Sequence, residues 1–191
     1  MIDRDALAAA HPPGRPPPRV LDAACGTGLL LRRLRDALPR AELYGVEASE
    51  EMLAQARSAL PPGENVQLIR ATIGAGPRAD LPFAPRTFDL VTCANALHYF
   101  PDPVATLAGL AELLASGGQL VLVDFARRAP PFPWPLFEWL VRRFDAGHLR
   151  AYTLAQAREL CQSAGLRVEA ERTFTINWLW HGWGLRASTA S

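Results

Sequence analysis

The chain contains no lysine, and all 20 of its basic residues are arginine. Without a lysine side chain, the protein has no amine that could form a Schiff base and no lysine general base. The phosphate-binding loop of P-loop nucleoside triphosphatases requires a Gly-Lys pair, so that class of enzyme is excluded as well.

Cysteine is scarce: Cys25, Cys93 and Cys161 are the only three. Their odd number and wide spacing form no Cys-x-x-Cys pair and no compact cluster with histidine, which argues against a disulfide framework and a structural zinc site. We therefore expect no metal site and a reducing, cytoplasmic location. The sequence lacks an apolar run of about 18 residues and begins with charged residues, so neither a membrane span nor a signal peptide is expected.

A large excess of charge is also absent, because 20 basic and 19 acidic residues leave a net charge of +1. So small a charge creates no global field that would attract nucleic acid, and we expect no nucleic-acid partner. The hydrophobic content of 49% is typical of an ordinary globular domain.

The most informative feature present is an apolar strand that runs into a glycine-containing turn, VLDAACGTG at residues 20–28. Gly26 and Gly28 allow the backbone to pass close to a ligand. A second apolar run ends on Glu47, where a carboxylate can accept hydrogen bonds from a ribose diol. This pattern predicts half of a nucleotide-binding α/β sheet.

Strands and helices alternate through most of the chain. We expect strands near 19–24, 41–46, 65–70, 87–93 and 118–124, and helices near 28–38, 49–59, 103–115 and 153–163. The runs at 166–175 and 176–186 have no helix between them, so the second should return antiparallel to the first. We predict a doubly wound, mostly parallel, seven-stranded Rossmann-like α/β sheet with a C-terminal antiparallel β-hairpin.

The domain organisation is expected to be simple. Residues 1–18 combine an alanine-rich turn with a proline-rich stretch, which predicts an extended, poorly ordered arm. Residues 19–191 are expected to form one domain, and no internal repeat is present.

Five segments in order resemble the class I S-adenosylmethionine-dependent methyltransferases, specifically the small single-domain enzymes similar to the ubiquinone and menaquinone methylases. They are 21–28, 45–53, 81–83, 87–100 and 113–120. The resemblance covers about Arg19 to Arg186. It implies S-adenosyl-L-methionine as cofactor and methyl transfer by in-line displacement to a small-molecule acceptor, whose reacting atom (oxygen, nitrogen, carbon or sulfur) stays open.

The resemblance also assigns a cofactor pocket. The turn with Ala24, Cys25, Gly26 and Gly28 should hold the methionine portion, with Asp22 near its amino group. Glu47 should bind both ribose hydroxyls. The remaining candidates are Ala48 and Met52 beside the adenine, Thr72 and Ile73 after the third strand, and Asn95 and Ala96 after the fourth. For Met52, core packing is an equal alternative.

Two positions depart from the family pattern. Ala24 stands where glycine is usual, which is a small change. No aspartate ends the third strand: counting along the strand places Thr72 there, whereas counting back from Leu81 places Pro77 there. Thr72 could accept one hydrogen bond from adenine, or Asp80 could fold back to replace the missing carboxylate.

His98 is the candidate catalytic residue, as a general base. It follows the fourth strand, where the active site of the family opens. A base is needed only if the acceptor is a hydroxyl or a carbon acid. The alternative is a histidine at a helix start that hydrogen-bonds the backbone.

Aromatic residues concentrate late in the chain. The segment 129–150 is a candidate substrate lid for an aromatic or apolar acceptor, or else it caps the open end of the sheet. Trp178, Trp180 and Trp183 indicate packing in the hairpin or the interface of a homodimer.

Two other functions share parts of this pattern. A nicotinamide-dependent oxidoreductase also uses a glycine turn and an acidic strand end, but Leu29 and Leu30 occupy the place of its third glycine. A non-catalytic cofactor-binding subunit that stabilises a partner is the second alternative.

Overall fold

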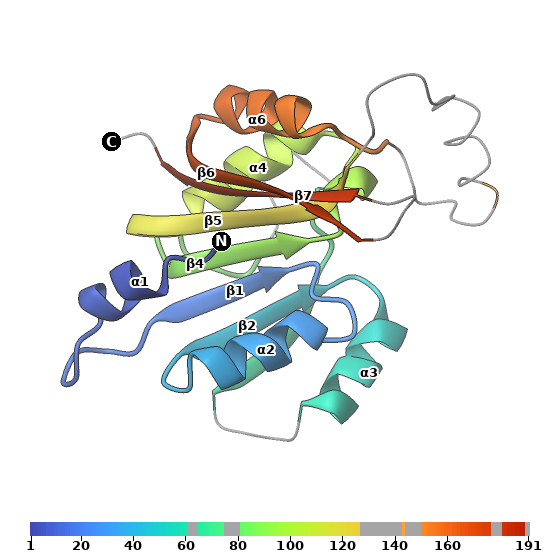
Figure 1. Ribbon diagram of the computed structural model, residues 1–191. Helices are drawn as coiled ribbons and strands as arrows, with labels where there is room; N and C mark the ends of the chain where they lie inside the picture. Colours follow the sequence, from blue (N-terminus) through green and yellow to red (C-terminus); the bar gives the residue numbers. More distant parts are fainter. Residues whose placement is uncertain (61–64, 75–80, 127–142, 144–149, 177–180, 190–191) are drawn as a thin grey trace.

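The structure is a computed structural model that describes residues 1–60, 65–74, 81–126, 143, 150–176 and 181–189. Figure 1 shows a central sheet with helices on either side. The strands are β1 (Arg19–Ala23), β2 (Glu42–Glu47), β3 (Val66–Arg70), β4 (Phe88–Ala94), β5 (Leu114–Ala126), β6 (Leu166–Thr175) and β7 (His181–Thr189). The helices are α1 (Arg4–Ala10), α2 (Leu29–Ala37), α3 (Glu50–Ala59), α4 (Pro103–Glu112) and α6 (Leu154–Ser163), with a short 3-10 helix η1 (Leu97–Tyr99).

The strands form one seven-stranded sheet in the order β3-β2-β1-β4-β5-β7-β6. The pairs from β3 to β5 are parallel, and β7 runs antiparallel to both β5 and β6. The predicted fold class and the antiparallel hairpin are therefore confirmed. The strand order reverses between β1 and β4, and in open α/β sheets ligands bind beyond the carboxyl ends of the strands at such a switch point.

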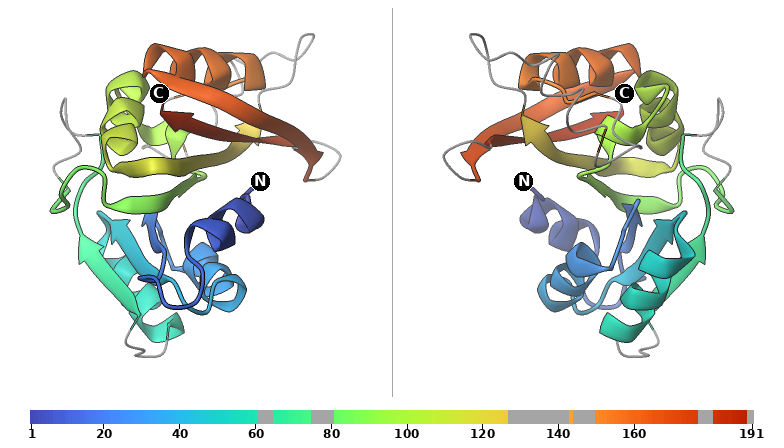
Figure 2. Two further views of the ribbon diagram at one scale, coloured as in Figure 1. Left: turned by 90° about the vertical axis from the view of Figure 1, so that its left-hand side faces the viewer. Right: turned by 90° about the vertical axis from the view of Figure 1, so that its right-hand side faces the viewer.

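Helices cover the two faces of the sheet unequally. Figure 2 shows α1, α2 and α3 on one face and α4 and α6 on the other. Because side chains alternate along a strand, Leu120 and Leu122 of β5 pack with α4 and α6, whereas Val121 and Val123 face the side of α2. Both faces bury leucine-rich cores, so the sheet is apolar on both sides, as expected of a parallel sheet.

The helix expected at 103–115 is shorter than predicted. α4 ends at Glu112, and β5 already begins at Leu114 rather than near residue 118. The carbonyl of Leu113 accepts hydrogen bonds from the amides of Thr87 and Phe88, both at 2.9 Å. The helix therefore ends before the predicted residue 115, because the start of β4 supplies backbone hydrogen-bond donors to Leu113. The glycines at 117 and 118, which suggested a later end, carry no information about these distant partners.

The alanine-rich part of the N-terminal arm, expected to form a turn, is helical instead. Residues 4–10 form α1, whose Asp3 side chain accepts a hydrogen bond from the amide of Ala6. Leu7 is buried, and His11 lies 3.0 Å from the Asp89 carboxylate. Side chains and backbone therefore attach this segment to the sheet, which the proline-rich composition alone does not indicate.

The hairpin tryptophan that the structure describes is part of the core. Trp183 on β7 is fully buried, and its indole N–H donates to the carbonyl of Tyr152 at 3.0 Å. Trp183 therefore packs within the protein core, which is one of the two roles expected for the hairpin tryptophans. Trp178 and Trp180 lie outside the described residues. None of the helices that the structure describes is long and apolar enough to cross a membrane.

Candidate active site

The turn after β1 has three residues in the left-handed backbone region: Ala24 (φ 59°), Gly26 (φ 55°) and Gly28 (φ 77°). A Cβ at Gly28 would lie 3.1 Å from the Cβ of Ala56 and 3.1 Å from Leu60. Glycine is therefore needed here both for its backbone conformation and to let the start of α2 approach α3. Ala24, the departure from the family pattern, adopts the positive φ at the cost of some backbone strain.

Glu47, the last residue of β2, binds the turn directly. One oxygen, Oε2, accepts the amide N–H of Gly26 at 3.0 Å, and the other, Oε1, accepts that of Ser49 at 2.9 Å. The side chain of Ser49 in turn caps α3 by accepting the amide of Met52 at 3.2 Å. The predicted ribose carboxylate and the predicted methionine turn thus form one hydrogen-bonded unit, which the structure brings together from two strands.

Asp22 lies near the end of β1 and is shielded from solvent, with 1% exposure. The hydroxyl of Thr92 on β4 donates to its Oδ1 at 2.7 Å. Burial raises the pKa of Asp22 to about 7; the Thr92 hydrogen bond opposes this increase and the nearby Glu47 charge adds to it. Thr92 was not among the predicted site residues, since a threonine inside an apolar strand carries no sequence signal.

Cys25 and Cys93 are buried within the sheet region rather than exposed as nucleophiles. Burial raises the pKa of the Cys25 thiol to about 12, and burial also raises the pKa of Cys93 strongly. Both thiols therefore stay protonated at neutral pH. Cys25 contributes its backbone to the turn, where its amide donates to the carbonyl of Val46 at 2.9 Å.

Met52 is 45% exposed, so the core-packing alternative for this residue is wrong. Its sulfur lies 3.9 Å from the position that a Cβ would take on Gly26, which places Met52 beside the turn. Ala48 is exposed next to it, and its carbonyl accepts the Arg70 Nε–H at 3.3 Å. These residues form the exposed flank of the turn.

The remaining predicted residues follow β3 and β4. Thr72 is exposed and Ile73 half-buried just beyond the end of β3, whereas Asp80 lies outside the described residues. Asn95 is exposed in the left-handed region (φ 53°), and Ala96 beside it is buried. The amide of Asn95 donates to the carbonyl of Val123 at 2.7 Å, which joins the ends of β4 and β5.

His98 is buried in η1 against a carboxylate that the sequence analysis missed. Its Nδ1 lies 2.8 Å from Oδ1 of Asp124, near the end of β5, and the two residues are 6% and 3% exposed. The Asp124 carboxylate also accepts the amides of Phe125 at 2.7 Å and His98 at 3.3 Å. An acidic residue after an apolar run, the same signal that identified Glu47, could have identified Asp124.

This arrangement fixes the chemistry available to His98. A carboxylate oxygen accepts hydrogen bonds, so Nδ1 of His98 donates to Asp124 and Nε2 is the ring nitrogen that can take up a proton. The ring of His98 thus contacts a carboxylate, and its backbone amide donates to the same carboxylate. The lid expected at 129–150 falls almost entirely outside the described residues.

Comparison with known proteins also indicates a methyltransferase. The family described as "Methyltransferase domain" matches residues 20–118, just over half of the chain. A demethylmenaquinone methyltransferase from Thermus thermophilus is 38% identical over 127 residues, which cover 66% of this chain and 54% of that protein. A ubiquinone biosynthesis O-methyltransferase from Vibrio cholerae is 35% identical over 115 residues, covering 60% and 44%. The chain spans about half the length of the curated relatives it matches.

Solved structures share the fold at lower identity. A putative methyltransferase from Bacillus halodurans superimposes with a TM-score of 0.74 at 19% identity, covering 99% of both chains. A magnesium protoporphyrin IX methyltransferase from Synechocystis, solved with S-adenosylhomocysteine bound, has a TM-score of 0.68 at 22% identity and covers 92% of this chain and 75% of that one. The family match, the relatives and this fold agree, and the chain belongs to the methyltransferase domain family.

Proposed function

We propose that the protein binds S-adenosylmethionine at the carboxyl ends of β1, β2 and β4 and transfers its methyl group to a small-molecule acceptor. When bound, this cofactor supplies a methyl group on a positively charged sulfur that is a good leaving group. The protein's part is to hold the acceptor in line with that methyl group. The single observation that carries the proposal is the Glu47 carboxylate bound to the glycine turn.

The described residues fit such a cofactor. A carboxylate has about four lone-pair sites, and Glu47 uses one on each oxygen for the amides of Gly26 and Ser49. The other two can accept the two hydroxyls of a ribose. A Cβ on Gly26 would meet nothing nearer than the Met52 sulfur at 3.9 Å, so the backbone there is open to a ligand.

The charge of the site also favours a cationic ligand. Glu47 and the buried Asp22 both lie at the turn, and burial holds the pKa of Asp22 at about 7. A positive group bound nearby would lower this pKa, so ligand binding and ionisation of Asp22 would favour each other. We place the methionine portion on the turn, with Asp22 acting through its charge because its side chain is shielded.

We further propose His98 as the general base and Asp124 as the residue that positions it. Asp124 holds the Nδ1 proton, which directs the basic Nε2 away from the carboxylate and fixes the orientation of the ring. A base is required for an acceptor hydroxyl or carbon acid. The names of the relatives from Thermus and Vibrio support a quinone-related acceptor as one candidate.

The protein is also proposed to act in the reducing cytoplasm. Its three cysteines are free and buried, which is typical of proteins that never meet an oxidising compartment. Cell fractionation with an antibody against the chain tests this location.

Isothermal titration with S-adenosylhomocysteine tests the cofactor site. We expect binding to the protein as purified and roughly 100-fold weaker binding to Glu47→Ala, because two or more charge-assisted hydrogen bonds are lost. Glu51→Ala, an exposed carboxylate on the neighbouring helix, is the matched control and should bind normally. Binding of NADH without any binding of S-adenosylhomocysteine would instead favour the oxidoreductase.

A panel of phenols, thiols, amines and carbon acids, assayed for transfer of a labelled methyl group, separates an enzyme from a non-catalytic subunit. We expect turnover with a hydroxyl or carbon-acid acceptor. Cofactor binding with no turnover on any acceptor, with and without a partner protein, would support the non-catalytic alternative.

A further inference from the structure

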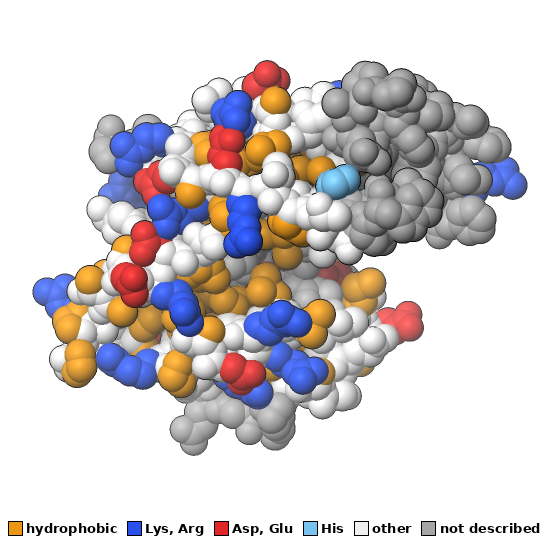
Figure 3. Space-filling model, viewed as in Figure 1, with side chains coloured by type: hydrophobic (Ala, Val, Ile, Leu, Met, Phe, Trp, Pro, Cys, Tyr) orange, Lys and Arg blue, Asp and Glu red, His pale blue; other side chains and the backbone are white. Residues whose placement is uncertain are grey.

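An apolar groove lies on the sheet face that carries α1 and α2 (Figure 2). It has a volume of about 380 Å³. Its floor is formed by Thr92 and Ala94 of β4 and Val121 and Val123 of β5, and its walls by Met1, Ile2, Arg4, Leu30, Arg33, Leu34 and Ala37. Figure 3 shows a hollow on this face with hydrophobic side chains inside it and basic side chains at its borders.

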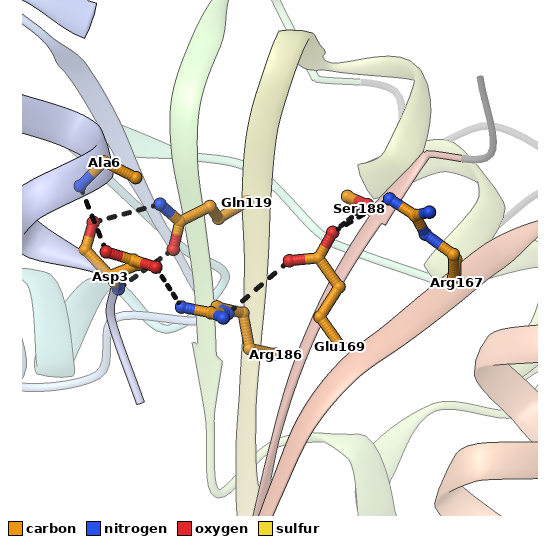
Figure 4. Close-up of polar contacts among 7 residues, drawn as sticks. All are labelled: Asp3, Ala6, Gln119, Arg167, Glu169, Arg186 and Ser188. Carbon is orange, nitrogen blue, oxygen red and sulfur yellow. Dashed lines mark hydrogen bonds and ion pairs between the residues drawn. The ribbon is translucent and has the colours of Figure 1, made fainter. Parts of the chain in front are cut away.

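The N-terminal wall of this groove is anchored to the sheet. The Asp3 backbone exchanges two hydrogen bonds with the Gln119 side chain of β5, at 3.0 and 3.1 Å. Its carboxylate pairs with Arg186 of β7 at 2.8 Å, and Arg186 in turn lies 3.6 Å from Glu169 (Figure 4). These contacts join three strands to the start of α1. The groove is therefore formed before any ligand binds, which lowers the cost of ordering on binding.

Two arginines line the border of the groove. Arg4 on α1 and Arg33 on α2 form no ion pair with any residue that the structure describes. By contrast, their neighbour Arg35 pairs with Asp36, and Arg186 pairs with Asp3. An apolar cavity bordered by two guanidinium groups is complementary to a molecule with an apolar body and an anionic end.

We propose that this groove binds an aliphatic carboxylate of medium chain length, with the alkyl chain along β4 and β5 and the carboxylate between Arg4 and Arg33. The helix wall from Leu30 to Ala37 extends about 10 Å at 1.5 Å per residue, which limits the ligand to a chain of about the length of decanoate. This site adjoins the proposed cofactor site, since Thr92 in its floor donates to Asp22, but it goes beyond that site because its other lining residues belong neither to the glycine turn nor to the His98–Asp124 pair.

A chain-length series of hexanoate, octanoate and decanoate, titrated below the micelle concentration, tests the apolar part of the proposal. We expect the affinity to rise about fourfold per methylene group, since each buried CH₂ contributes about 0.8 kcal/mol. Ala37→Phe, which fills the groove from an exposed helix position, should abolish the dependence on chain length. An affinity that does not change with chain length would overturn the proposal.

The charged part is tested by Arg4→Gln and Arg33→Gln. Each should weaken decanoate binding by about fivefold or more and leave the binding of decanol unchanged. Arg32→Gln removes an exposed arginine from the same helix that does not line the groove, and it should bind decanoate normally. Equal losses in Arg32→Gln and Arg33→Gln would contradict a specific anion site.

The oligomeric state provides a further outcome. Size-exclusion chromatography with light scattering should show no change in mass when decanoate is added or when Ala37→Phe is introduced. A dimer that dissociates in either case would show instead that a second copy of the chain covers the groove. Titration with S-adenosylhomocysteine is run on every variant, so a failure of the groove proposal with intact cofactor binding is distinguishable from a failure of the proposed function.

Discussion

The two halves of the candidate site are built in different ways. The cofactor half comes from one β–α–β unit, and its contacts join a side chain to backbone amides, as where Glu47 accepts the amides of Gly26 and Ser49. The proposed acceptor half is a contact between two side chains, His98 and Asp124, that lie 26 positions apart in the sequence. The first half thus depends on backbone conformation, and the second depends on which strands are neighbours in the sheet.

This difference predicts how each half fails. A change in the turn should alter folding and cofactor binding together, because the same backbone serves both. A change in the His98–Asp124 pair should impair catalysis while S-adenosylhomocysteine still binds. Three sets of single substitutions test this distinction, described from the largest expected effect to the smallest. They change His98 or Asp124, then Asp22, and finally Gly28.

Replacing His98, the proposed base, should have the largest effect. We expect His98→Gln to lower turnover by about 10³-fold and Asp124→Asn by about 100-fold, since a neutral amide in place of the carboxylate could no longer hold the Nδ1 proton in place. The measurements are the pH–rate profile and the ¹⁵N chemical shifts of the His98 ring, which should report a change of tautomer in Asp124→Asn. Unchanged turnover in His98→Gln would restrict this histidine to its structural role.

Asp22→Asn should change the dependence of stability on pH. The pKa of Asp22 is about 7 in the folded protein and about 3.9 in an unfolded chain. The folded state therefore binds the proton more tightly, and this group reduces stability as the pH rises from about 4 to about 7. Asparagine, like the protonated acid, carries no charge, so the variant should be more stable than the parent by ~4 kcal/mol at pH 8 and about equally stable near pH 4.

Urea unfolding at several pH values measures this effect. Asp36→Asn, an exposed aspartate on α2, is the matched control and should follow the parent at every pH. If the free energies of unfolding of Asp22→Asn and the parent changed with pH in parallel, ionisation of the buried Asp22 carboxyl would not reduce stability.

Gly28→Ala should have the smallest effect. We expect it to lower the free energy of unfolding by about 1–2 kcal/mol. The added methyl group meets Ala56 at 3.1 Å in a backbone with φ 77°. Gly165 has the same φ of 77° with nothing within 4 Å, so Gly165→Ala measures the backbone strain alone. The difference between the two melting temperatures isolates the contact between α2 and α3. Equal losses of stability in Gly28→Ala and Gly165→Ala would show that the close approach of α2 and α3 at Gly28 contributes nothing to the cost of the substitution.

Periodicity and turn residues predicted the sheet well because they act over short distances along the chain. The strand starting at Arg19 and the helix after Gly28 follow directly from local apolar patterns and glycine positions. The early start of β5 at Leu114 and the helix at 4–10 were not predicted. In both cases the deciding partners, Thr87 and Phe88 for Leu113 and Gln119 with Arg186 for Asp3, are distant in the sequence or unmarked by any motif.

The sequence by itself determined the family, the sheet order implied by it, and the glycine turn with Glu47. These depend on backbone conformations and strand ends that residues near in the chain specify. Only the tertiary structure decided that Asp124 supports His98, that Asp22 is buried with a raised pKa, and that a groove remains beside α1. Each of these depends on which side chains become neighbours once strands β1, β4 and β5 lie side by side, and no local pattern carries that information.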